Sequence, residues 1–311
     1  MRYSKFVHDD VLRRESGRVD EMIHTKKIAF IGTGVMGASI VKHLLKADYE
    51  VTVYSRTKSK AEGLMELGAK WAETPKEAAN DQDIIFTMVG FPTDVEEVYL
   101  SENGLLESAK EGAIVVDMTT SESTLAKKIY EAAKQKGISS IDAPVSGGDI
   151  GAQNGTLSIM VGGDRSVFEE ILPILQIFGE NIVYQGDAGA GQHTKMCNQL
   201  LIATNMIGVC ESIAYAFKAG LDIEKVLQSI SAGAAGSWSL SNLGPRMIKG
   251  DLEPGFYLKH FIKDMKIAID EAERMNLDLP GVKLSKELYN TLLEKGYGDK
   301  GTQSLIKYYM D

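Results

Sequence analysis

Short apolar runs alternate with amphipathic stretches along the first half of the sequence. Segments of helical spacing separate the apolar runs, which cover residues 27–31, 51–54, 83–89, 113–117, 138–142, 156–161 and 182–184. Strands that are regularly separated by helices favour a parallel sheet with crossover helices on its faces. The sequence therefore predicts an α/β fold that begins with a doubly wound, mostly parallel sheet.

The pattern changes after residue 186, where only helical spacing continues. Helices are expected over residues 191–219, 223–231, 260–275, 282–294 and 302–309. A chain of 311 residues also has the length of two domains. We expect a leader arm over 1–25, a sheet domain over 26–187 and an all-α domain over 188–311.

Charge and cysteine content narrow the class of protein. The sequence has 34 basic and 43 acidic residues, a formal net charge of −9, which argues against a general nucleic-acid binder. Cys197 and Cys210 lie in one predicted helix, about 20 Å apart at ~1.5 Å per residue, too far for a disulfide. No cluster of cysteine and histidine suggests a metal, and a reducing cytoplasm is expected. The longest apolar stretch, 200–210, is shorter than a membrane span of roughly 18 residues, so no membrane is expected.

A glycine-rich loop directly follows the first apolar run. Gly32, Gly34 and Gly37 stand in a G-x-G-x-x-G pattern between a predicted strand and a predicted helix. The first glycine permits a tight turn, the second lets the backbone approach a pyrophosphate, and the third packs helix on strand. This context predicts a Rossmann-like dinucleotide site. The alternative is a glycine-rich turn in a flavodoxin-like protein without a dinucleotide.

The end of the second predicted strand bears on the choice of nucleotide. NAD sites usually place an acidic residue there, but this chain has Ser55, Arg56, Thr57 and Lys58, and no acid before Glu62. Arg56 offers a planar donor fork to a 2′-phosphate. These residues favour NADP, with NAD still possible. They could also be a solvated helix start.

Two further segments carry candidate catalytic and substrate-binding groups. Ser146, Gly147 and Gly148 follow the 138–142 run and could form a backbone nest for a small carboxylate, or simply a turn. Lys195 precedes the apolar 200–210 stretch, with Asn198 and Gln199 on the same helical face. A partly desolvated lysine could act as a general acid/base, whereas spacing alone is more typical of a surface lysine.

Together, these segments resemble the β-hydroxyacid dehydrogenase family, which includes 3-hydroxyisobutyrate and tartronate semialdehyde dehydrogenases. The resemblance rests on an ordered set of motifs at 31–37, 117–120, 142–148, 189–195, 236–238 and 263–264. It implies that Lys195 is the catalytic residue. It further implies a substrate site of Ser146, Gly147, Gly148, Asn198, Gln199 and Trp238, although Trp238 could equally be a core residue. The implied coenzyme site contains Gly32, Thr33, Gly34, Val35, Met36, Met88, Val89, Thr120 and Lys263.

The resemblance also implies a reaction. Hydride would pass between a nicotinamide and a small 3-hydroxy acid or its semialdehyde, while Lys195 exchanges the proton on oxygen. Ile202 stands where the decarboxylating 6-phosphogluconate dehydrogenases carry a second acid, and imine reductases generally replace the lysine, so carbonyl chemistry is expected. Reduction of glyoxylate or succinic semialdehyde, and a non-catalytic NADP-binding module, are the alternatives. The long apolar helix of the second domain suggests a homodimer or homotetramer.

Overall fold

The computed structural model describes residues 26–310, so the leader arm expected over 1–25 lies outside the described residues. The described chain divides into two compact units. Unit 1 contains residues 26–119 and 123–192, and unit 2 contains residues 120–122 and 193–310. The chain therefore passes between the units three times.

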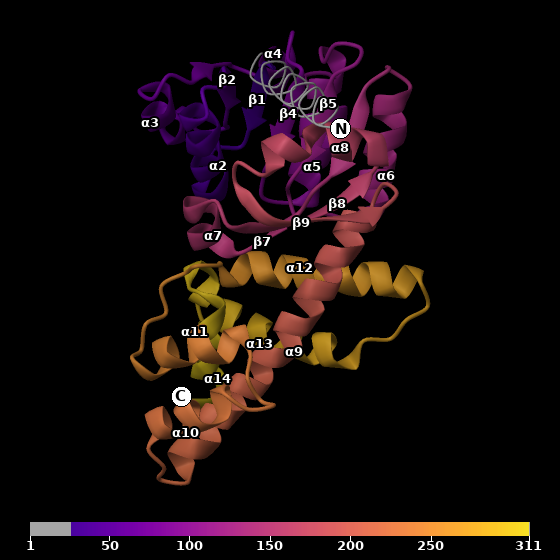
Figure 1. The fold of residues 1–311 in the computed structure, drawn as a ribbon. Coiled ribbons are helices and arrows are strands. Elements are labelled where there is room, and N and C mark those ends of the chain that lie inside the picture. Colours follow the sequence, from indigo (N-terminus) through magenta and orange to yellow (C-terminus); the bar gives the residue numbers. More distant parts are fainter. Residues whose placement is uncertain (1–25, 311) are drawn as a thin grey trace, which may run out of the picture. The chain divides into compact units, whose positions relative to one another are not determined.

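A nine-stranded sheet forms the centre of unit 1 (Figure 1). Its order is β3-β2-β1-β4-β5-β6-β8-β7, with β9 paired to β8. Pairing is parallel except where β8 meets β6 and β7. The mostly parallel, doubly wound sheet predicted from the sequence is thus confirmed. The strands are β1 (Ile28–Ile31), β2 (Val51–Tyr54), β3 (Lys70–Trp71), β4 (Ile84–Thr87), β5 (Ile114–Asp117), β6 (Ser139–Asp142), β7 (Val145–Ser146), β8 (Leu157–Gly163) and β9 (Gly179–Gly186).

Helices cover both faces of this sheet, which explains the continuous apolar character of the central strands. Ile28 and Phe30 of β1 pack into one hydrophobic cluster, whereas Ala29 and Ile31 pack into another. The successive residues of a strand point to opposite faces, so both faces are buried. The helices are α2 (Val35–Lys46), α3 (Glu62–Met65), α4 (Pro75–Ala79), α5 (Pro92–Leu100), α6 (Ser123–Lys134), α7 (Gly148–Asn154) and α8 (Arg165–Leu175).

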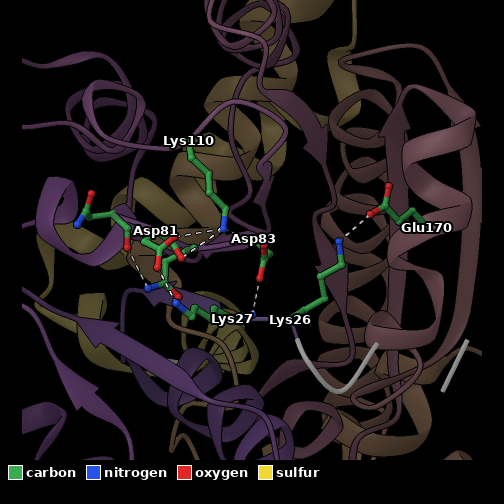
Figure 2. A network of polar contacts seen from close by, with 8 residues as sticks. Lys26, Lys27, Asp81, Asp83, Lys110 and Glu170 are labelled. Atoms are coloured by element: carbon green, nitrogen blue, oxygen red, sulfur yellow. Dashed lines mark hydrogen bonds and ion pairs between the residues drawn. The ribbon is translucent and has the colours of Figure 1, made fainter. Parts of the chain in front are cut away.

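An ion-pair network holds the amino ends of the central strands (Figure 2). The Lys27 backbone N–H donates to Asp83 Oδ2 at 2.7 Å, and the Lys27 ammonium lies 2.6 Å from Asp81 Oδ2. Lys110 lies 2.9 Å from Asp83 Oδ1, and Lys26 pairs with Glu170 at 3.2 Å. These partly exposed pairs connect the segments that lead into β1, β4 and β5. The candidate site lies at the opposite edge of the sheet, where the parallel strands end.

Unit 2 is helical, as predicted (Figure 1). One hydrophobic cluster joins Met206 and Ile213 of α9 to Phe261, Tyr289 and other residues of the later helices. Two expectations need correction. The helix expected over 302–309 is a 3₁₀ turn (Thr302–Leu305) followed by a short helix, and α11 lies in a segment for which no helix was expected. The helices are α9 (Ala190–Lys218), α10 (Ile223–Ser231), α11 (Trp238–Ile248), α12 (Leu258–Arg274), α13 (Pro280–Glu294) and α14 (Ile306–Met310).

Helix α9 is unusual in its length and apolar character. By length and composition it could cross a membrane, yet only 33% of its most apolar 18-residue stretch is buried within the structure. Seven of its eight exposed residues recur every three or four positions, and the eighth is Phe217. The seven form a stripe of Cys197, Leu201, Thr204, Gly208, Glu211, Tyr215 and Lys218. We call these seven residues the α9 stripe. The opposite face of the helix packs in the core of unit 2.

Candidate active site

The glycine loop is folded so tightly that its first and third glycines have no room for a side chain. Gly32 has a φ of 103°, and a Cβ there would lie 2.1 Å from the Met88 carbonyl oxygen. A Cβ on Gly37 would lie 2.0 Å from the Gly32 carbonyl oxygen. By contrast, Gly34 has open space where its side chain would be. The loop thus leaves exposed backbone at its second glycine, where a pyrophosphate is expected to approach.

The start of α2 has the features of an anion site. Gly34 is its N-cap and supplies no side-chain acceptor to the first turn. Thr33 is 2% exposed, and its hydroxyl oxygen has no hydrogen-bond partner among the described residues. Val35 is exposed and Met36 half-buried. Unused amides, the helix dipole and a buried hydroxyl fit the diphosphate of a dinucleotide.

The predicted 2′-phosphate loop lies at the end of β2. Ser55 is half-buried, whereas Arg56 and Thr57 are exposed. The Arg56 guanidinium lies 2.9 Å from Asp94 Oδ1, and Lys58 lies 3.3 Å from Glu73. Lys58 is the first residue of a 3₁₀ turn (Lys58–Lys60). Its position therefore also agrees with the alternative interpretation, in which these residues are a solvated helix start.

The ends of β4 and β5 carry the remaining coenzyme candidates. Met88 and Val89 follow β4 and are half-buried. The Val89 N–H donates to Thr119 Oγ1 at 3.0 Å. Thr120 belongs to unit 2, where its carbonyl oxygen accepts from the Lys263 ammonium at 2.8 Å. The structure thus brings Thr120 and Lys263 into direct contact.

Two buried carboxylates stand side by side at the ends of β5 and β6. Asp117 and Asp142 are in register across the two strands. Burial raises the pKa of Asp117 to about 6, and the negative charge of Asp142 contributes. Burial also raises the pKa of Asp142, which accepts from the backbone N–H groups of Gly189 at 2.7 Å and Gln192 at 2.8 Å. Asp142 therefore holds the start of α9, a role that sequence reasoning missed.

The predicted carboxylate nest is partly regular structure rather than a simple turn. Ser146 ends β7 and is half-buried, Gly147 is the N-cap of α7, and Gly148 begins that helix. The two glycines have φ values of 129° and 64°, in the region that favours glycine. Gly147 is exposed and Gly148 half-buried, so the main chain that follows Ser146 is accessible to a ligand.

Lys195 lies in the first turns of α9 and is only 7% exposed. The pKa of its ammonium is lowered to about 8, mainly by burial, with the carboxylate of Asp264 opposing the shift and the charge of Lys263 adding to it. Lys195 is therefore not the exposed surface lysine that its spacing alone would suggest. An ammonium with a pKa near neutrality can both donate and accept a proton.

A chain of hydrogen bonds connects the two candidate amides to Asp264. The Asn198 side-chain amide donates to Gln199 Oε1 at 2.7 Å, and the Gln199 amide donates to Asp264 Oδ2 at 2.6 Å. Asp264 Oδ1 lies 3.1 Å from the Lys263 ammonium. Gln199 is buried and tied to Asp264, while Asn198 is half-buried. Asp264 was not among the predicted site residues, although it stands next to Lys263 in the 263–264 motif, which could have indicated it.

Trp238 is not a core tryptophan. It is 69% exposed and is the first residue of α11, whose N-cap, Ser237, accepts the Leu240 N–H at 3.0 Å. An exposed aromatic side chain at a capped helix start is available to a ligand or a partner.

Comparison with known proteins places both units in one family. Residues 27–186 match the NAD-binding domain of 6-phosphogluconate dehydrogenase, and residues 189–309 match the NAD-binding domain described for NADP-dependent 3-hydroxyisobutyrate dehydrogenase. An uncharacterized oxidoreductase, YkwC, of Bacillus subtilis is 59% identical over 92% of this chain and 99% of its own. A probable mitochondrial 3-hydroxyisobutyrate dehydrogenase-like protein of Arabidopsis thaliana is 49% identical over 90% of this chain and 84% of its own.

The fold agrees with that assignment. The structure of Mycobacterium tuberculosis 3-hydroxyisobutyrate dehydrogenase with L-serine has a TM-score of 0.85 and 27% identity, covering 92% of this chain and 99% of the other. The resemblance drawn from the ordered motifs is confirmed. The chain belongs to the β-hydroxyacid dehydrogenase family and is an NAD(P)-dependent oxidoreductase that acts on CH–OH groups.

Proposed function

We propose that this protein is an NADP(H)-preferring oxidoreductase that transfers a hydride between nicotinamide and a small 3-hydroxy acid or its semialdehyde. The observation that carries the proposal is the burial of Lys195, which lowers the pKa of its ammonium to about 8 although the carboxylate of Asp264 opposes the shift. At neutral pH this ammonium is charged, but it gives up its proton far more readily than a solvated lysine.

Lys195 acts as the general acid and base. A bound nicotinamide coenzyme supplies the hydride in reduction and accepts it in oxidation. In reduction, Lys195 donates a proton to the carbonyl oxygen as the carbon–oxygen double bond becomes a single bond, and water reprotonates the amine. In oxidation, neutral Lys195 removes the hydroxyl proton. Asp264 favours the charged form of Lys195 and thereby sets the pH at which these roles exchange.

The other candidates bind and orient the two ligands. The Ser146 hydroxyl and the backbone of Gly147 and Gly148 hold the substrate carboxylate, while Asn198, Gln199 and Trp238 orient the rest of the substrate. The diphosphate interacts with the loop residues Gly32, Thr33, Gly34, Val35 and Met36. Met88, Val89, Thr120 and Lys263 flank the ribose and nicotinamide portions. Ser55, Arg56 and Thr57 take the 2′-phosphate, which is the basis for proposing NADP.

A kinetic screen tests this function. We expect NADPH-dependent reduction of small semialdehydes that carry a carboxylate, with Lys195→Met reducing kcat by at least about a hundredfold. Activity mainly on glyoxylate or succinic semialdehyde would favour the alternative reductase on the same scaffold. Coenzyme binding without turnover on the whole panel would favour a non-catalytic module, and full activity of the Lys195→Met variant would refute the mechanism.

We further propose a cytoplasmic homodimer or homotetramer in which a second copy covers the α9 stripe. Leu201 and Tyr215 are 72% and 76% exposed there, and Gly208 between them permits close approach of another helix. Leu201→Glu should convert the oligomer to monomer in size-exclusion chromatography with light scattering. Leu67→Glu, at a 57% exposed position just after α3 in unit 1, is the control. A wild-type protein that is monomeric would contradict the proposal.

A further inference from the structure

The loops that follow β2 and β4 are joined by an ion pair. These strands lie on either side of β1 in the sheet, so their carboxyl-end loops flank the glycine loop. Arg56, two residues after β2, donates from Nη1 to Asp94 Oδ1 at 2.9 Å. Asp94 lies in the first turn of α5, after β4. The guanidinium assigned to the 2′-phosphate therefore already has an anionic partner.

Asp94 is the fixed member of this pair. Its second oxygen, Oδ2, accepts the Phe91 N–H at 3.0 Å, so the carboxylate closes the first turn of α5. Pro92 begins the helix and restricts the same turn. The Asp94 side chain is 14% exposed, whereas the Arg56 side chain is 73% exposed. Arg56 can change its rotamer, but Asp94 cannot move away without breaking the helix start.

The second cation of this loop is also paired. Lys58 lies 3.3 Å from Glu73 and over the Trp71 ring, 5.1 Å from its centroid. Both members of the Lys58–Glu73 pair are more than half exposed, so solvent screens it strongly. The Arg56–Asp94 pair contains the less exposed carboxylate and is the stronger competitor for a phosphate.

We propose that Asp94 is a specificity-determining residue that reduces the selectivity of this enzyme for NADPH over NADH. Asp94 does so by holding the Arg56 guanidinium. The 2′-phosphate of NADPH must share or displace that contact, whereas the binding of NADH, which has a 2′-hydroxyl, is not weakened by it. The inference rests on the proposed function in one respect, namely that Arg56 meets the 2′-phosphate.

Asp94→Asn tests the proposal with little structural change. The asparagine oxygen can still accept the Phe91 N–H, so the helix start is preserved while the charge is removed. Glu73→Gln is the matched control because it removes the same charge from the neighbouring, more exposed pair. We expect the Asp94→Asn variant to raise the NADPH-to-NADH ratio of kcat/KM by about three- to tenfold, and Glu73→Gln by less than about twofold. An unchanged or lower ratio in the Asp94→Asn variant would overturn the proposal.

A binding measurement separates this inference from the proposed function. Calorimetry with 2′,5′-ADP, which carries the 2′-phosphate without the nicotinamide, should show about three- to tenfold tighter binding to the Asp94→Asn variant. In an Arg56→Ala background the same substitution should have little effect, because Asp94 acts through the guanidinium. An undiminished effect in that background would refute the inference. If Arg56→Ala alone leaves 2′,5′-ADP binding unchanged, the assignment of Arg56 in the proposed function fails instead.

Discussion

Replacing Lys195 with methionine should make the protein less active and more stable. Methionine has a similar unbranched length and no charge, so it fills the same buried position without a cost of desolvation. Lys195 is 7% exposed, and burial lowers its pKa from 10.5 to about 8. A buried ammonium with a lowered pKa destabilises the folded state at every pH at which it is charged.

The size and the sign of the effect follow from that shift. At about 1.4 kcal/mol per pH unit, the fall from 10.5 to about 8 corresponds to roughly 3 kcal/mol. Between these two values the unfolded chain binds more protons than the folded one, so wild-type stability rises with pH through this window. Below pH 8 the full penalty is present. The variant should therefore be more stable by up to roughly 3 kcal/mol at pH 7, and the difference should disappear near pH 10.5.

Urea unfolding of both proteins at pH 7 and pH 10 measures this difference. Lys42→Met, at an exposed position of α2, is the control and should change the free energy of unfolding by less than about 0.5 kcal/mol. Equal stability of wild type and the Lys195→Met variant at pH 7 would refute the depressed pKa. A gap that does not narrow at pH 10 would refute the linkage to protonation.

Three further predictions concern buried carboxylates. Asp264→Asn removes the charge that raises the pKa of Lys195, so the rate of reduction should fall at a pH about one unit lower than in wild type. An unshifted pH profile would contradict the role of Asp264. The folded pKa of Asp117 is raised to about 6, so wild type should lose stability relative to the Asp117→Asn variant as pH rises from 4 to 6; a flat difference in thermal unfolding would count against this shift. Asp142→Ala leaves the Gly189 and Gln192 amides without their acceptor and should cost about 3–5 kcal/mol, whereas a loss below about 1 kcal/mol in urea would show that the start of α9 needs no such anchor.

The sequence predicted the parts of this protein that depend on local pattern. The apolar run at 27–31 and the glycines after it predicted β1, its turn and α2, because strand burial and a tight turn each leave a signal within a few residues. Strand β3, with two residues, is too short to show any periodicity. Helix α7 begins with a glycine and contains a second, Gly151, so its composition indicates a turn.

The site was less predictable because its chemistry depends on residues far apart in the chain. The pKa of Lys195 is lowered chiefly by its burial in the folded chain, and Lys263 and Asp264 of α12 modify that shift in opposite directions. Arg56 likewise looks like an unpaired cation in the sequence, and its partner, Asp94, follows 38 residues later. Single-sequence patterns report the type of a side chain, but the tertiary fold decides its partner and its charge state.

The threefold passage of the chain between the two units has a consequence for dissecting this enzyme. Residues 120–122 belong to unit 2 although they are flanked on both sides by residues of unit 1. A fragment that starts at His193 would therefore lack the Thr120 carbonyl that accepts from the Lys263 ammonium and the Glu122 carboxylate 3.8 Å from Arg274. Unit 2 therefore cannot be obtained intact by a single truncation, and a split or permuted version would have to carry the 120–122 segment together with the helices that it contacts.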